Sequence, residues 1–275
     1  MDTYNFFFFF SASITFILVV LPVAYSHETD QFMECNGTFN CGTIQGIRYP
    51  FWGNGRPRYC GHRGFELLCH ENQFPAIDIN SQRFRVLNIS RTGTMTIAPV
   101  DIWDDPCPQQ LYNISLDHTL FDFASSIRDL DIFYGCPLED DIPSQNRFVC
   151  NTSNGDNYAY YLDESLSRIH RSELEGCGVR IMVPVSRSGF DELWSGIDKI
   201  ADAWNKGFDV VYVKEMVPCM ACRNSGGVCG SNDTSLNFLC FCPDKPYSKS
   251  CIVPGMFSSS LNIFLSNCLT ACFMV

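Results

Sequence analysis

The sequence predicts a mostly β, disulfide-rich fold with one or two short helices. Three observations lead to this expectation. The 275 residues contain 16 cysteines, many more than a chain kept reduced in the cytosol carries. Short runs of β-branched and aromatic residues alternate with turns that contain Gly, Pro and Asn. Hydrophobic residues make up 46% of the chain and charged residues 18%, so a packed core is expected and wholesale disorder is excluded.

The first 26 residues have the features of a signal peptide. Phe6–Val23 is nearly all apolar, and Ala24 and Ser26 place small residues just before a cleavage site after Ser26. The segment ahead of the apolar run contains Asp2 but no lysine or arginine, so an uncleaved signal anchor is the alternative. Either interpretation directs the following residues to the secretory pathway and to an extracellular or cell-surface location.

Glycosylation signals agree with this compartment. Five Asn-X-Ser/Thr sequons mark positions that we expect to be exposed and to carry glycans. They lie at Asn36, Asn88, Asn113, Asn151 and Asn232.

The tail at residues 255–275 contains no charged side chain. Its most apolar part, Leu261–Val275, is shorter than the roughly 20 residues that a membrane-spanning helix needs. Three interpretations stay open: a shortened membrane span, a lipid-anchor signal without its polar spacer, or a tail with no structural role. Cys268 and Cys272 lie in this tail and are therefore left out of the disulfide framework.

The strands and one helix can be placed from local patterns. Runs rich in β-branched and aromatic residues predict strands at Ala76–Ile79, Phe84–Ser90, Thr94–Val100 and Gly178–Val185, with a turn at 91–93. Apolar residues with a period of 3.6 predict a helix that covers a sheet. This apolar face consists of Leu193, Ile197, Ile200, Ala201 and Trp204, with Ser188 and Asp191 as a capping box, Gly207 as the terminating glycine, and Trp194 and Trp204 as core residues.

Charge is divided unevenly along the chain. Residues 35–100 hold seven arginines and three acidic residues, whereas residues 101–143 hold ten acidic residues and one arginine. The formal net charge is −11. Because nucleic-acid binding needs a basic surface, this balance argues against a general nucleic-acid partner.

The last six cysteines before the tail have a distinctive spacing, C-x2-C-x6-C-x10-C-x-C-x8-C. The final C-x-C-x8-C resembles the end of an EGF-like module, although the first gap of two residues is shorter than that module usually has. The resemblance implies the pairs Cys219–Cys229, Cys222–Cys240 and Cys242–Cys251. Zinc is the alternative for such spacings, but an oxidising compartment favours disulfides, so no metal or cofactor is expected.

The other eight framework cysteines stabilise the N-terminal part of the chain, and their pairing cannot be read from the sequence. They are Cys35, Cys41, Cys60, Cys69, Cys107, Cys136, Cys150 and Cys177.

An ordered series of motifs resembles the galacturonan-binding module of plant wall-associated receptor kinases and the cysteine-rich module that follows it. The motifs are Cys35–Gly42, Ile47–Gly53, Arg56–Gly61, Gly64–Cys69, Tyr134–Pro137, Gly207–Phe208, Cys219–Cys222, Ser225–Gly230 and Phe238–Cys242. Ectodomains of leaf-rust-resistance-locus receptor-like kinases are similar to the same arrangement. The resemblance implies a β-rich galacturonan-binding-like module at 27–145. It also implies a smaller α+β cysteine-rich module at 146–254, whose EGF-like end spans 219–251, with a boundary near Gln145–Cys150.

No enzyme activity is expected of this chain. Family members carry a Ser/Thr kinase domain, but the G-x-G-x-x-G, H-R-D and D-F-G motifs of kinases are absent from the sequence. The G-x-S-x-G and H-E-x-x-H motifs of hydrolases are absent as well.

The expected ligand is acidic cell-wall polysaccharide, that is, pectin or oligogalacturonide. Guanidinium groups can bind its carboxylates, and aromatic faces can contact the sugar rings. A loop around Pro50–Pro57 offers both kinds of side chain. The candidate residues are Arg48, Tyr49, Trp52, Arg56, Arg58, Tyr59 and Arg63. The alternative is that the aromatic residues belong to the core and that the arginines pair with the acidic segment 101–143.

Two other function classes stay open. The chain could be a receptor or decoy ectodomain for a peptide or a protein co-receptor. A remote alternative is a glycoside hydrolase that uses two neighbouring carboxylates. The acids that could supply them are Asp101, Asp104, Asp105, Glu139, Asp140 and Asp141.

Overall fold

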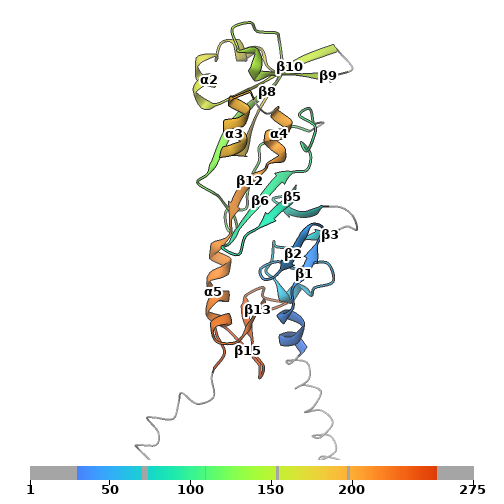
Figure 1. The fold of residues 1–275 in the computed structure, drawn as a ribbon, viewed down its shortest axis with the longest axis vertical. Coiled ribbons are helices and arrows are strands. Elements are labelled where there is room, and N and C mark those ends of the chain that lie inside the picture. Colours follow the sequence, from blue (N-terminus) through green and yellow to red (C-terminus); the bar gives the residue numbers. More distant parts are fainter. Residues whose placement is uncertain (1–29, 70–73, 109, 153–154, 197–198, 253–275) are drawn as a thin grey trace, which may run out of the picture. The chain divides into compact units, whose positions relative to one another are not determined.

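The computed structural model describes residues 30–252 except 70–73, 109, 153–154 and 197–198. The expected signal peptide and the apolar tail at 255–275 lie outside the described residues. The described part is mostly β-strand with few short helices (Figure 1), which confirms the predicted fold class. It divides into two compact units, Thr38–Met216 and the described residues on either side of that range. None of its helices is long and apolar enough to cross a membrane.

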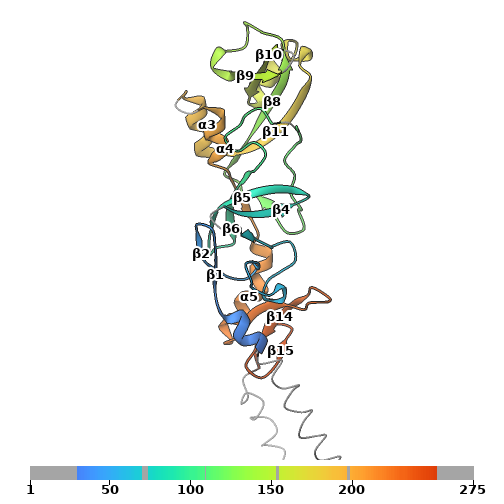
Figure 2. The same cartoon turned by 90° about the vertical axis from the view of Figure 1, so that its right-hand side faces the viewer.

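The first large sheet has six antiparallel strands in the order β3-β4-β5-β6-β12-β7. Its β4, β5 and β6 are the three strands expected from the sequence, and they lie side by side (Figure 2). Phe84 and Val86 of β5 are buried, while Arg83 and Arg85 lie on the opposite face of the same strand. The bounds are β3 Leu68–Cys69, β4 Pro75–Ile79, β5 Gln82–Ile89, β6 Thr94–Pro99, β7 Asp122–Phe123 and β12 Phe208–Val211.

The second large sheet has four antiparallel strands in the order β11-β8-β10-β9. Its edge strand β11 was expected from the sequence, and Val183 and Val185 of β11 are buried. The module boundary near Gln145–Cys150 falls at the start of β9, in the same sheet as β8, and stays a prediction. The bounds are β8 Ile127–Cys136, β9 Arg147–Thr152, β10 Gly155–Leu162 and β11 Val179–Ser186, with α2 Glu164–Ile169, η2 Ser144–Asn146 and η3 Glu173–Gly176 beside them.

The prediction of a single helix between residues 188 and 207 is wrong, because the segment forms two helices. Helix α3 spans Arg187–Trp194 and helix α4 spans Ile200–Asn205, and they pack against each other (Figure 1). Gly196 has a φ of 71° and follows the end of α3. The cap of α3 is Ser186 rather than Ser188, since the Ser186 Oγ accepts a hydrogen bond of 3.1 Å from the N–H of Gly189.

Three residues of the predicted apolar face are buried, namely Leu193, Ile200 and Trp204, whereas Ala201 is half-buried and Ile197 lies outside the described residues. Leu193 and Trp204 are 2% exposed, and Trp194 is half-buried and stacks on Phe190. Gly207 follows the end of α4 as expected, with a φ of 66°. A Cβ at this position would lie 2.4 Å from the Ile97 carbonyl oxygen, so only glycine fits against β6.

The cysteine-rich end consists of a three-stranded sheet and the C-terminal part of helix α5. The sheet contains β13 Val228–Ser231, β14 Phe238–Phe241 and β15 Pro246–Tyr247. Helix α5, Val213–Asn224, was not expected because Pro218 lies inside it. It places Cys219 and Cys222 on one helical face, which explains the short gap between them.

The disulfides of this end are Cys219–Cys229, Cys222–Cys240 and Cys242–Cys251, the pairs that the EGF-like resemblance implied. The sulfur atoms of Cys240, Cys242 and Cys251 lie within 4.8 Å of one another, but all three are oxidised and offer no thiolate to zinc. Among the other eight cysteines the structure forms Cys41–Cys69, Cys107–Cys150 and Cys136–Cys177, and both Cys35 and Cys60 are disulfide-bonded as well.

Four of the five sequon asparagines have described side chains. Asn36, Asn88 and Asn113 are exposed and Asn232 is half-exposed, so each can carry a glycan without disturbing the core. Glycosylation at these positions stays a prediction.

Candidate functional site

All seven candidate binding residues lie in one loop, residues 48–63, which we call the site loop. It follows β2 (Ile44–Ile47), which pairs with β1 (Phe39–Cys41). The disulfide Cys41–Cys69 closes the chain around it. The β1–β2 pairing and this disulfide therefore restrain both ends of the site loop, which limits the movement of its side chains.

An aromatic cluster under the loop forms its base. The rings of Phe51 and Phe65 have centroids 5.5 Å apart, and both side chains are 1% exposed or less. Phe65 also contacts Phe121 with centroids 4.8 Å apart, and Phe51 lies 5.4 Å from Tyr212 in an edge-to-face arrangement. Burial and edge-to-face packing of these rings stabilise the base of the loop.

Trp52 is fixed between this base and the solvent. Its backbone N–H donates to the Phe65 carbonyl at 3.2 Å, and its carbonyl accepts from Leu67 at 2.8 Å. Its indole Nε1 donates to the His62 carbonyl at 3.1 Å. The polar edge of the indole is thus satisfied while the half-buried ring keeps an accessible side.

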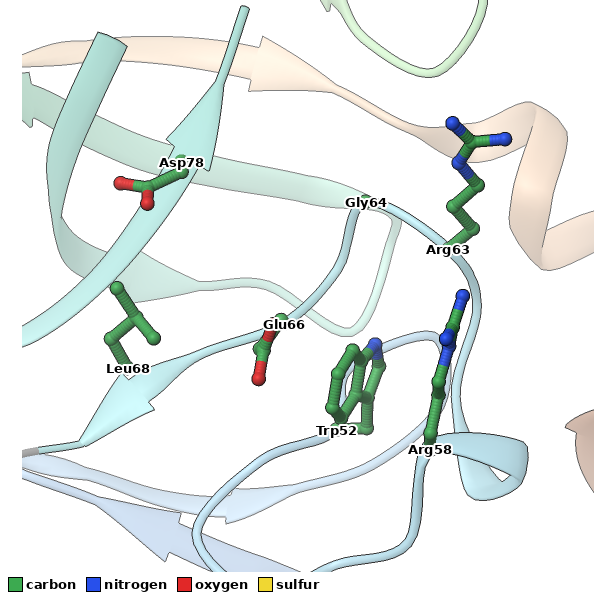
Figure 3. Close-up of a pocket in the computed structure, with 7 residues that line it drawn as sticks. All are labelled: Trp52, Arg58, Arg63, Gly64, Glu66, Leu68 and Asp78. Atoms are coloured by element: carbon green, nitrogen blue, oxygen red, sulfur yellow. The ribbon is translucent and has the colours of Figure 1, made fainter. Parts of the chain in front are cut away.

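The accessible side of Trp52 lines a pocket of about 320 Å³. Figure 3 shows the Arg58 side chain alongside the indole, with Arg63 towards the same end of the pocket. Glu66 and Asp78 lie on the other side. The full lining consists of Trp52, Arg58, Arg63, Gly64, Glu66, Leu68 and Asp78.

The register of the strands explains how distant residues reach this pocket. A parallel bridge places Trp52 beside Glu66, and β3 pairs Leu68 with Ala76 of β4. Asp78 lies on the same face of β4 as Ala76, two residues further on. The pocket floor therefore continues from the site loop onto the face of the six-stranded sheet.

The charges of the pocket are unequal at its two ends. Arg58 and Arg63 are exposed, and neither has an ion-pair partner within 4.0 Å among the described residues. At the other end, both carboxylate oxygens of Asp78 accept hydrogen bonds from Arg83, at 2.8 and 3.0 Å. Glu66 is exposed and forms no ion pair within 4.0 Å with another described residue. The arginine end can bind an anion, and the Glu66 carboxylate can accept hydrogen bonds from hydroxyl groups.

Four predicted site residues do not line the pocket. Tyr49 is 7% exposed and belongs to the core, as the alternative interpretation of the aromatic residues held. Arg56 is half-buried, donates from Nη2 to the Cys60 carbonyl at 3.5 Å and lies 6.0 Å from the Phe39 ring centroid. Burial, and then the charge of Arg48, lower the pKa of Arg56. Arg48 is exposed and Tyr59 half-buried, both outside the pocket lining.

Asp117 of the acidic segment 101–143 interacts electrostatically with Arg63 of the site loop. The hydrogen bonds from Thr119 are the main reason that the pKa of Asp117 is lowered, and Arg63 contributes through its charge. The charge of Arg63 is therefore partly balanced by Asp117.

The acids considered for hydrolysis lie elsewhere and make local contacts. Asp101 accepts a hydrogen bond from the Tyr112 hydroxyl, and Asp105 accepts one from the N–H of Cys107 at 2.9 Å. Asp104 accepts a hydrogen bond from the Asn205 side chain. None of the six acids lines the pocket.

A second cavity of about 410 Å³ lies beside β8 and α2. Its charges largely pair with each other, because Arg180 binds Asp131 and Arg168 binds Glu164. The Trp52 pocket, with two arginines free of such pairs, is the better candidate for an anionic ligand.

Gly61 fixes the position of the Trp52 ring and provides a test of the site. A Cβ at residue 61 would lie 2.6 Å from the indole Cδ1 and 2.8 Å from the Pro50 carbonyl oxygen. The substitution Gly61→Ala is expected to displace the indole and to lower the free energy of unfolding by about 1–3 kcal/mol, measured by urea denaturation. Gly37→Ala is the control for an added methyl group, because a Cβ there would meet no heavy atom within 4 Å and the φ of Gly37 is not positive. Unchanged tryptophan fluorescence in Gly61→Ala would contradict this packing.

Comparison with known families matches two segments of the chain. The family described as wall-associated receptor kinase galacturonan-binding matches residues 35–99, which include the whole site loop. The family described as wall-associated receptor kinase C-terminal matches residues 145–245. No solved structure matches the chain.

Curated relatives from Arabidopsis thaliana are leaf rust 10 disease-resistance locus receptor-like protein kinase-like proteins. The protein numbered 2.5 is 31% identical in an alignment of 265 positions that covers 87% of this chain and 38% of the relative. The protein numbered 2.8 is 30% identical in an alignment of 237 positions that covers 81% of this chain and 26% of the relative. The chain thus spans between about a quarter and two fifths of the length of these relatives.

Proposed function

The chain belongs to the extracellular regions of the wall-associated and leaf-rust-resistance-locus receptor-like kinases, and we propose that it binds acidic pectin through the Trp52 pocket. The two segments that match known families are a galacturonan-binding module and a receptor-kinase C-terminal module. The ligand class is polygalacturonate, a chain of sugars with one carboxylate per residue.

The single observation that carries this proposal is the arginine end of the pocket. Arg58 and Arg63 are exposed beside the half-buried ring of Trp52 and have no ion-pair partner among the described residues. A guanidinium group binds a carboxylate through two parallel hydrogen bonds, and an indole face packs on the apolar side of a sugar ring. Glu66 completes the site by accepting hydrogen bonds from sugar hydroxyl groups.

The whole chain has a formal charge of −11, so distant acids oppose a polyanion. Binding therefore depends on the local arginines, and its electrostatic part weakens when salt screens them. We expect the affinity to fall as salt is raised from about 0.01 M, where the screening length is about 30 Å, to about 1 M, where it is about 3 Å.

The direct test replaces Arg58 and Arg63 together with glutamine. Affinity for polygalacturonate, measured by calorimetry or by binding to a pectin surface, is expected to fall by about 10- to 100-fold, since each charge-assisted contact contributes about 1.5–3 kcal/mol and the effects overlap. The matched control is the double variant Arg91→Gln and Arg128→Gln, which removes two exposed arginines outside the pocket. Equal affinities of both double variants would remove the pocket from the proposal.

A further inference from the structure

Arg85 of β5 is held between two aromatic rings. Its guanidinium carbon lies 3.9 Å from the ring centroid of Phe74 and 4.0 Å from that of Trp103. Both rings therefore lie within the distance at which an aromatic face attracts a guanidinium group. Contacts with two rings restrain the side chain, while a guanidinium group keeps its N–H donors in its own plane, where they can bind an anion.

The N–H groups of Arg85 have no acceptor among the described residues. No hydrogen bond or ion pair of this side chain is found there, although neighbouring Arg83 is fully engaged with Asp78. Both rings of the stack are half-buried, as is Arg85 itself. A fixed guanidinium group with unused donors is prepared for a planar, bidentate anion such as a carboxylate.

The stack lies on the same sheet face as the Trp52 pocket. Directly opposite residues of antiparallel strands project to one face, and β3, β4 and β5 pair Leu68 with Ala76 and Ala76 with Arg85. Leu68 is part of the pocket wall. With about 4.8 Å between neighbouring strands, the backbone of Arg85 lies about 10 Å across the sheet from that of Leu68.

We propose that Arg85, with Phe74 and Trp103, forms a second carboxylate subsite for the same ligand chain. The inference rests on the proposed function, since it needs a polyanion in the Trp52 pocket. One sugar residue in the pocket cannot also reach Arg85, whereas an extended oligomer that crosses β3 and β4 can. The site therefore selects for oligogalacturonides long enough to span the two subsites over single uronic acids or dimers.

The experiment measures the affinity of oligogalacturonides of increasing, defined length for the intact glycosylated chain and for Arg85→Gln. For the native sequence, affinity is expected to rise stepwise at the length that reaches the second subsite. Arg85→Gln is expected to remove that step and to bind long oligomers about 10-fold more weakly, the effect of losing one charge-assisted contact. Its affinity for the shortest binding oligomer should be unchanged, which also shows that the variant is folded. Arg91→Gln, an exposed arginine in the turn after β5, controls for the loss of one positive charge.

The outcomes separate this inference from the proposed function. If the native chain binds oligomers but Arg85→Gln behaves like Arg91→Gln at every length, the second subsite is overturned and the pocket stands. A loss in Arg85→Gln that is the same for short and long oligomers would also overturn it, because it would show a general effect on the fold. If the native chain binds oligomers of no length, the proposed function itself fails.

Discussion

Replacing Cys41 and Cys69 together with serine is expected to lower the free energy of unfolding by about 3.5 kcal/mol and to weaken binding of polygalacturonate. The two residues are 28 positions apart in sequence, and the stabilisation that a disulfide gives by restricting the unfolded chain grows with the length of the loop that it closes. The closed loop contains Trp52, Arg58 and Arg63, so their relative positions should loosen as well. Denaturant unfolding and ligand titration of the same sample measure both effects.

The disulfide Cys242–Cys251 provides the matched control, because it closes only 9 positions and lies outside the galacturonan-binding match. Removal of this disulfide is expected to lower the free energy of unfolding by about 2.5 kcal/mol and to leave the affinity for polygalacturonate unchanged. Equal losses of affinity in the two double variants would show that binding depends on overall stability and not on closure of the site loop.

Replacing Arg180 with alanine is expected to lower the free energy of unfolding by about 3 kcal/mol at neutral pH. Asp131 has a side chain only 7% exposed, and Arg180 donates to both of its carboxylate oxygens at 2.8 Å. Without Arg180, a nearly buried charge would remain unpaired near Asp129, whose pKa is raised by burial and by the charge of Asp131.

Arg168→Ala is the control for this variant. Arg168 pairs with Glu164 in helix α2, but both side chains are more than 70% exposed. An exposed pair of this kind contributes about 0.5 kcal/mol or less. A similar unfolding free energy for Arg180→Ala and Arg168→Ala would contradict the role assigned to the buried carboxylate.

Local patterns predicted four strands correctly because each of these four carries its own signal, whereas the long strands β8 and β10 were not predicted. The runs at β4, β5, β6 and β11 are rich in β-branched residues, and the structure places strands there within one or two residues. The prediction of one continuous helix was wrong for a physical reason. Gly196 adopts a left-handed conformation after α3, and a second helix begins at Ile200. An apolar period indicates which side of a segment is buried, but it does not show whether the segment forms one continuous helix.

The site was only partly predictable for a related reason. Composition indicated arginines next to aromatic residues, and three of the seven candidates line the pocket. Glu66 and Asp78 could not be assigned to it, since their proximity depends on which strands pair and in what register. Arg85 lies in a predicted strand, but its stack with Phe74 and Trp103 arises only when the turn after β6 folds back.

The covalent loop closed by the Cys41–Cys69 disulfide also affects what happens when an extracellular protease cuts the chain. Exposed loops are the usual places where a chain is first cut, and residues 48–63 include exposed positions at Arg48, Arg58 and Arg63. A single cut anywhere in this segment would leave both halves covalently joined, with Phe51 and Phe65 still available to hold them against the aromatic cluster. Until the disulfide is reduced, the nicked protein would differ from the intact chain only by the one water molecule that hydrolysis adds, so the chain could be cut once within the site loop without losing the loop.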